Sequence, residues 1–193
     1  MHLAASLATM PEPGEAIQTT TQFVLRSDFP NIFITNEDGR DRYWVRSGVA
    51  QRLGLWSLRD LTGRELVSVQ QQTSWPLPTY GVYQAGEQVA TVSEAPGPRA
   101  ARWRAAIRMR LLGTPAGLHY TVHLPDAQDL EVESDPEAVE YHFSRAGRQV
   151  ATVGLQWLAW APTFGLSVRI AHGEDATLIL ALTAMIESAW RRL

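Results

Sequence analysis

The chain has 193 residues, of which 45% are hydrophobic and 19% are charged, as is typical of one folded domain or at most two small ones. Its 17 basic residues against 20 acidic ones give a formal charge of -3, which argues against a general nucleic-acid-binding protein, because neutralising many phosphates needs a basic excess. The chain has no cysteine, and all its basic residues are arginine. Disulfides, cysteine-ligated metals, thiol nucleophiles and lysine Schiff-base chemistry are therefore excluded.

Residues 1–20 show no hydrophobic period and include the run from Pro11 to Glu15, which favours a flexible tail. The mildly apolar residues 1–10 lack the basic residues that open a secretory signal. The longest apolar run, 176–186, is shorter than the ~20 residues that a membrane-spanning helix needs. We therefore expect a cytoplasmic protein with no transmembrane span and a single folded domain over residues 21–193.

After the tail, short runs of β-type residues are separated by turn signals every ~8–12 residues, a pattern that favours an all-β sandwich or barrel. Gly39 and Gly63 suit hairpin turns, because glycine accepts a positive φ, and Pro96-Gly97-Pro98 resembles a linker. The expected strands cover residues 22–26, 31–36, 42–46, 54–59, 65–71, 79–84, 88–93, 102–111, 117–124, 129–133, 138–144, 149–155 and 164–170.

The clearest alternation lies in residues 102–111, where apolar side chains share one face. The opposite face carries Arg102, Arg104, Arg108 and Arg110. This arginine stripe is a candidate site for an anion or a phospholipid headgroup, because arginine binds phosphate through two parallel hydrogen bonds. The alternative is a solvated outer face, partly neutralised by the acidic residues of 129–133 if strands 102–111, 117–124 and 129–133 form a meander.

Residues 86–92 and 147–153 form an internal repeat. The two segments, GEQVATV and GRQVATV, agree at six of seven positions, and an aromatic strand precedes each. A turn and strand recurring in the same order predict two related halves of one sheet system. The alternative is that two ordinary hairpins have converged on one sequence.

Residues 175–186 change to a helical pattern. Asp175 can cap a helix, and the run that follows is apolar nearly all round. A helix that is apolar on every side and does not cross a membrane must be surrounded by protein. A sheet of about twelve strands closed around it would bury every side and leave no open edge.

Several segments resemble one known family in their order and spacing. They are 29–39 (FPNIFITNEDG), 43–45 (YWV), 53–66 (LGLWSLRDLTGREL), 79–80 ahead of 88–92, and the C-terminal helix. Together they are similar to the LURP-one-related proteins over nearly the whole folded chain. The resemblance implies a tubby C-terminal-like fold, which is a mainly β, twelve-stranded closed antiparallel barrel around a central hydrophobic helix. The fold relatives of the LURP-one-related family include the tubby proteins, which bind phosphoinositides, and the phospholipid scramblases, which are linked to calcium and lipids.

The resemblance carries over a fold and no site. Glu174 and Asp175 offer too few oxygen ligands for the scramblase calcium segment, since calcium takes six to eight, and the basic headgroup residues of tubby proteins have no identifiable match. His119 and His123 share a strand face but lie ~13 Å apart, too far to share one ion. His142 lies on another strand and could approach either of them, but no cysteine or close acidic pair completes a ligand set. We expect no metal and no cofactor.

The segment 157–164 holds Trp157 and Trp160, which either contact a membrane interface or a partner, or cap one end of the barrel over the helix. The chain has no Gly-x-Ser-x-Gly, His-Glu-x-x-His or Gly-x-Gly-x-x-Gly motif, and a barrel filled by its own helix has no interior cavity. We expect a non-catalytic, monomeric protein, cytoplasmic or peripheral at a membrane, that binds a phospholipid headgroup or a protein partner at its outer surface. The alternatives are a scaffolding protein without a small ligand and an enzyme with a surface cleft.

Overall fold

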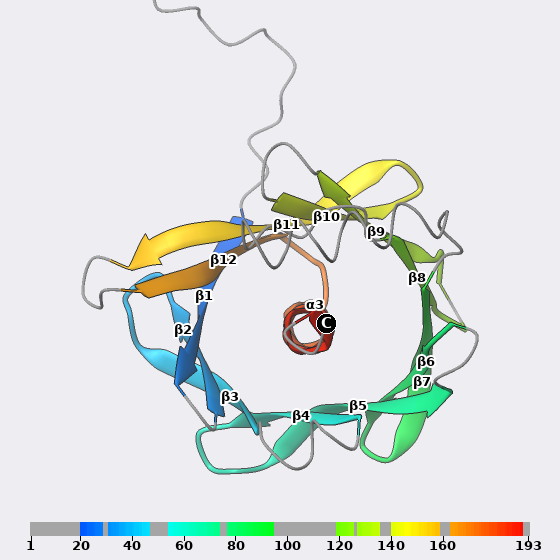
Figure 1. Cartoon of the computed structure of the whole chain (residues 1–193), viewed down its shortest axis with the longest axis horizontal. Helices are drawn as coiled ribbons and strands as arrows, with labels where there is room; N and C mark the ends of the chain where they lie inside the picture. Colours follow the sequence, from blue (N-terminus) through cyan, green and yellow to red (C-terminus); the bar gives the residue numbers. More distant parts are fainter. Residues whose placement is uncertain are drawn as a thin grey trace, which may run out of the picture.

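The computed structural model describes residues 20–28, 31–46, 54–73, 77–94, 119–125, 127–135, 140–158 and 163–190. Within these ranges the chain forms twelve strands and one helix (Figure 1). The strands are β1 (Thr20–Asp28), β2 (Asn31–Asn36), β3 (Asp41–Arg46), β4 (Leu55–Asp60), β5 (Glu65–Thr73), β6 (Thr79–Gln84), β7 (Glu87–Glu94), β8 (His119–His123), β9 (Leu130–Asp135), β10 (Glu140–Arg145), β11 (Arg148–Leu158) and β12 (Thr163–Ala171), and the helix is α3 (Ala176–Trp190). The expected strands that fall in these ranges match the observed ones to within three residues at each end.

The strands form one closed antiparallel barrel. Each strand pairs with the strands before and after it in the chain, and β1 closes the ring by pairing with β12, with Phe23 opposite Val168. Closure leaves no unpaired edge in the ring that another chain could extend. The expected twelve-stranded architecture is confirmed.

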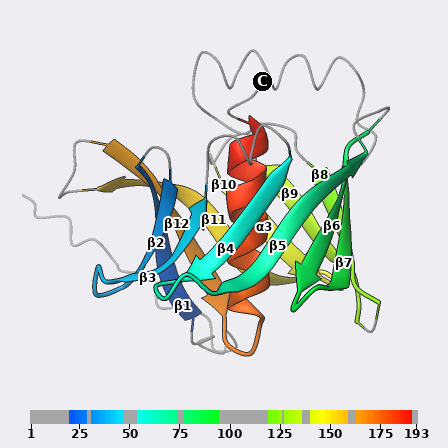
Figure 2. The same ribbon diagram turned by 90° about the horizontal axis from the view of Figure 1, so that it is seen from below.

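Alternate residues of the strands face the interior, where α3 runs along the barrel axis (Figures 1 and 2). In β2, for example, Ile32 and Ile34 are buried, and Phe33 between them is only half-buried. Residues 178–186 of α3 are all buried, including the polar Thr183, whose hydroxyl donates to the Ile179 carbonyl at 2.8 Å. The helix is apolar nearly all round because the wall contacts it on every side.

The expected strand 102–111 lies outside the described residues, and the meander built on it is wrong. β8 has β9 on one side and β7 on the other, with Thr91 opposite His123 and Val92 opposite Val122. No described strand separates β7 from β8, and the ring of twelve is complete without another. Alternation predicts that a segment suits a strand, but it does not predict which strand is its neighbour.

The internal repeat corresponds to two equivalent hairpins, β6–β7 and β10–β11. Both turns have two consecutive residues with positive φ, Ala85 and Gly86 (50° and 85°) and Ala146 and Gly147 (49° and 76°), as a type I′ turn requires. In both copies the glutamine after the turn donates to the threonine three residues on. The two hairpins lie four strands apart in a ring of twelve, whereas equivalent hairpins of two halves would lie six strands apart. The repeat therefore relates two hairpins and not two halves of the barrel.

These two hairpins hold the start of α3. Gln84, just before the first turn, donates to Asp175 Oδ2 at 3.2 Å. Arg145 occupies the equivalent position of the second hairpin and, with Arg148, pairs with Glu174 at 2.8 Å each. The Glu174 side chain is only 5% exposed, so the helix is fixed to the wall by a largely buried carboxylate.

Candidate binding surfaces on the outer wall

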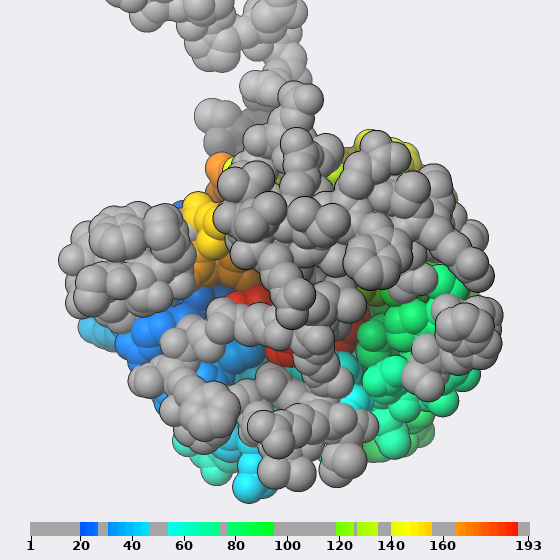
Figure 3. All heavy atoms as spheres, in the orientation of Figure 1, coloured from blue at the N-terminus to red at the C-terminus, as the bar shows by residue number. Residues whose placement is uncertain are grey.

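The side chains of α3 occupy the axis of the barrel, so the wall and the barrel ends are left for binding. Figure 3 shows atoms of α3 in the middle of the ring of strand atoms at one end of the barrel. Among the described residues, no helix combines the length and the apolar character needed to span a membrane.

The arginine stripe and the two tryptophan side chains singled out from the sequence fall outside the described part of the structure. The described ranges do not include residues 102–110 or their neighbours, and these residues carry the arginine stripe of Arg102, Arg104, Arg108 and Arg110. Trp160 also lies beyond the described ranges. Trp157 lies in β11 opposite Phe164 of β12, and its side chain is not among those described. The headgroup and membrane-contact interpretations of these residues stay predictions.

Two shallow hollows lie on the outer wall beside Arg169 of β12. The larger, of ≈ 280 Å³, is lined by Gln22, Glu140, Gly154, Leu155, Ser167 and Arg169, and the smaller, of ≈ 200 Å³, lies over Thr20, residues 149–152, Arg169 and Ala171. In the larger hollow the Ser167 hydroxyl accepts a hydrogen bond from the Gln22 amide at 3.1 Å. Neither hollow has a histidine in its lining, so neither holds a serine–histidine pair.

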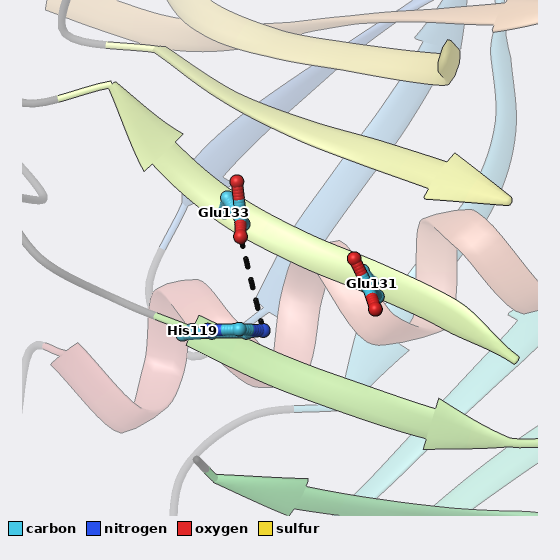
Figure 4. A group of neighbouring side chains, drawn as sticks. All are labelled: His119, Glu131 and Glu133. Atoms are coloured by element: carbon cyan, nitrogen blue, oxygen red, sulfur yellow. Dashed lines mark ion pairs between the residues drawn. The ribbon is translucent and has the colours of Figure 1, made fainter. Parts of the chain in front are cut away.

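A cluster of one histidine and two glutamates lies on the outer face of β8 and β9 (Figure 4). His119 is opposite Glu133 in the ladder, with 3.9 Å between Nε2 and Oε1, and Glu131 is two residues along the same face of β9. One ligand atom from each side chain lies within 4.8 Å of the other two, and all three residues are exposed. The cluster has the donor types that a metal ion uses.

From the sequence we compared His119 with His123 and found no close acidic pair. His123 instead pairs with Asp129, with 2.8 Å between Nδ1 and Oδ2. The acidic pair beside His119 comes from β9, where Glu131 and Glu133 alternate with buried Leu130 and Val132. That alternation is visible in the sequence, but the hairpin register that sets Glu133 opposite His119 is not.

A second surface, which we call the aromatic–arginine face, lies on the outside of β1–β4 (blue to cyan in Figure 1). One residue from each strand forms a continuous row across it, because each is directly opposite the next in the ladders. The row is Arg26, Phe33, Trp44 and Arg59. Arg42 and Arg46 flank Trp44 along β3 and complete the face.

The two aromatic rings of this face lie between two guanidinium groups. Arg26 lies over the Phe33 ring, 5.3 Å from its centre, and Arg59 over the Trp44 ring at 5.9 Å. These are cation–π distances. Arg59 also pairs with Glu65 at 3.2 Å, whereas the exposed Arg42 and Arg46 make no ion pair in the described part of the chain.

The β4–β5 turn holds this face in place. The Asp60 carbonyl accepts from Trp44 Nε1 at 3.0 Å, and the Gly63 carbonyl accepts from Arg59 at 2.9 Å. The Asp60 carboxylate accepts from the Thr62 hydroxyl and from the backbone N–H groups of Thr62 and Arg64. These hydrogen bonds, that of the Thr62 hydroxyl above all, lower the pKa of Asp60 from its ordinary value, although desolvation opposes them. The turn is therefore held by an ionised carboxylate at neutral pH.

A closed twelve-stranded barrel around its own C-terminal helix, with its chemistry on the outside, defines the structural class of this protein. The chain belongs to the LURP-one-related family, whose family model matches residues 19–187. No curated protein matches its sequence.

The fold is shared with a solved structure. This is the X-ray structure of a protein from Arabidopsis thaliana, with a TM-score of 0.54 and 14% sequence identity. The match covers 89% of this chain and 91% of the plant chain. At that identity the likeness shows a common fold.

Proposed function

We propose that this protein is a non-catalytic, monomeric cytoplasmic protein that binds anionic phospholipid headgroups through the aromatic–arginine face. The observation that carries the proposal is the row of Arg26, Phe33, Trp44 and Arg59 across four strands, with two exposed arginines beside it. Because the helix fills the barrel, the ligand cannot lie inside it, and the face that carries these groups is on the outer wall. The sequence patterns did not single out this aromatic–arginine face.

The chemistry of this face suits the surface of an anionic membrane. Arginine offers phosphate oxygens two parallel hydrogen bonds. Tryptophan is enriched where headgroups meet acyl chains, and phenylalanine is common on the membrane-facing side of interfacial helices. A strand surface held by a closed barrel presents these groups without first having to order them, which lowers the entropic cost of binding. The lipid-binding fold relatives of this family also favour a headgroup over a protein partner.

A vesicle co-sedimentation assay tests the proposal. Phosphatidylcholine vesicles with and without phosphatidylserine are compared at low and high salt, using wild type, Arg46→Glu and the double variant Arg42→Glu/Arg46→Glu. Because each basic residue near an anionic surface contributes ~1 kcal/mol, we expect Arg46→Glu to lose at least about fivefold in partitioning, and the double variant to lose more. High salt should weaken wild-type binding in the same way.

Arg169→Glu is the matched control, since it makes the same charge change at an exposed arginine on β12, outside the face. Its binding should stay close to wild type. Equal loss in Arg169→Glu and Arg46→Glu would show a response to net charge and not a site. Wild-type protein that does not sediment with anionic vesicles contradicts the headgroup proposal and favours a protein partner or a scaffold.

A further inference from the structure

We propose that the β8–β9 hairpin binds a divalent transition-metal cation of the zinc class between His119, Glu131 and Glu133. One imidazole nitrogen and two carboxylate oxygens are ligands that such ions accept, and three protein ligands leave a position for water. Calcium is a poor fit, because it takes six to eight oxygen ligands.

The spacing of the three side chains fits one shared ion. Metal–ligand bonds of ~2.0–2.2 Å place two ligands of a tetrahedral ion about 3.4 Å apart. The His119 nitrogen and the nearer Glu133 oxygen are already 3.9 Å apart, and no pair in the cluster exceeds 4.8 Å. All three side chains are exposed, so small rotations of their ends close the remaining gap without moving the backbone.

The backbone beneath the cluster is fixed by the core. Tyr120, Leu130 and Val132 alternate with the ligand positions and point inward, with exposed fractions of 3% or less. The ladder pairs Tyr120 with Val132 and holds the register that sets His119 opposite Glu133. The backbone of β8 and β9 that carries the three metal ligands is therefore rigid, and only the ends of the side chains have to be ordered on binding.

Within the described residues, no arginine lies opposite either glutamate of the cluster in the ladders, and this favours a cation. Glu131 and Glu133 lie on one strand face two residues apart, and the residues opposite Glu131 on either side, Thr121 and Ser144, carry no charge. Glu131 makes no hydrogen bond or ion pair within the described residues, and the 3.9 Å contact with His119 is the ion pair of Glu133. Two nearby carboxylates repel one another, and a shared cation removes that repulsion.

A histidine on the strand next to the cluster has one nitrogen without a partner among the described residues. His142 of β10 lies directly opposite Glu133, on the other side from His119. Its Nδ1 is buried and has no hydrogen-bond partner in the described part of the protein. Buried nitrogens normally have a partner, so this imidazole is an unsatisfied group on the strand next to the cluster.

The test is a calorimetric titration of the full, tag-free chain with zinc chloride, repeated with cobalt(II) chloride to follow its visible absorption. We expect one saturable site per chain. His119→Ala and Glu131→Gln/Glu133→Gln should each weaken binding by at least ~10-fold, because altering even the outer residues of a metal site costs 10–100-fold in affinity. Thermal unfolding of each variant checks that it is folded.

The matched control is His123→Ala. His123 lies on the same strand and is also exposed, but it pairs with a single carboxylate, Asp129. It should keep wild-type metal affinity. The proposal fails if wild type shows no saturable site, if binding survives the loss of both glutamates, or if His123→Ala is as damaging as His119→Ala.

Discussion

Two neighbouring acids at the start of α3 show what single residues do in this fold. From the sequence we considered Glu174 only as one of too few calcium ligands, whereas Asp175 was also predicted to cap the helix. In the structure Glu174 is ion-paired with two arginines, and Asp175 Oδ1 accepts from the backbone N–H groups of Thr177 and Leu178 at 2.9 and 3.1 Å. Both carboxylates therefore hold the helix in the barrel.

We expect Asp175→Ala to lower the free energy of unfolding by ~1 kcal/mol, because the substitution removes the N-cap acceptor. Asp175→Asn keeps an acceptor oxygen and should retain most of the stability. Urea denaturation followed by circular dichroism measures both. If the alanine variant is as stable as wild type, the cap does not contribute as the structure indicates.

The stability due to Asp175 should also depend on pH. Burial alone would raise the pKa of this carboxyl, but hydrogen bonds from Thr177, Leu178 and Gln84 lower it below the ordinary value of 3.8. A lowered folded-state pKa stabilises the protein above pH 3.8 and loses that contribution as pH falls through the lower value. The difference between wild type and Asp175→Asn should therefore shrink below about pH 4.

The cluster of His119, Glu131 and Glu133 shows how far a site made of single residues can be predicted from the sequence. The outward alternation of Glu131 and Glu133 and the position of His119 could each be predicted from period two. Their meeting depends on the register of the β8–β9 hairpin, which residue types alone do not specify because the face of His119 is solvent-exposed. The aromatic–arginine face was missed for the same reason, since each of its four strands supplies one residue of the row.

Among the elements, α3 was the most predictable. Its apolar run has no polar face, so its burial on all sides followed from composition, and its first residue follows a recognisable cap. The two equivalent hairpins were visible as a repeat, but their place in the ring was not. Pairing of β7 with β8 had no local signal, because it joins strands separated by more than twenty residues.

We expect Leu182→Ala to destabilise the protein by ~2–5 kcal/mol, since it opens a cavity between the helix and the wall. Leu182 is fully buried, with an exposed fraction of 0%. Leu61→Ala is the matched control, because Leu61 lies in the β4–β5 turn and is 62% exposed, and should change stability by less than ~0.5 kcal/mol. Equal, small effects of both substitutions in chemical denaturation would show that the helix is not tightly enclosed.

For the whole molecule, closure is what connects fold and function. The ring is completed by β1 and β12, from opposite ends of the described chain, and its interior is filled by the helix that follows β12. The closed barrel could be expected because only a complete wall covers an all-apolar helix. The outward-facing side chains of the wall could not be predicted in the same way, because no packing against the core limits which residues occupy those positions.

The most direct test of the account is amide hydrogen exchange across the full chain. If α3 is enclosed by the barrel, the amides of residues 180–186 should exchange only when the whole domain unfolds, among the slowest in the protein and with a free energy close to that of global unfolding. The exposed β4–β5 turn around Thr62 should exchange far faster. Helix amides that exchange as readily as that turn would contradict the enclosed helix, and with it the exclusion of a ligand from the barrel interior.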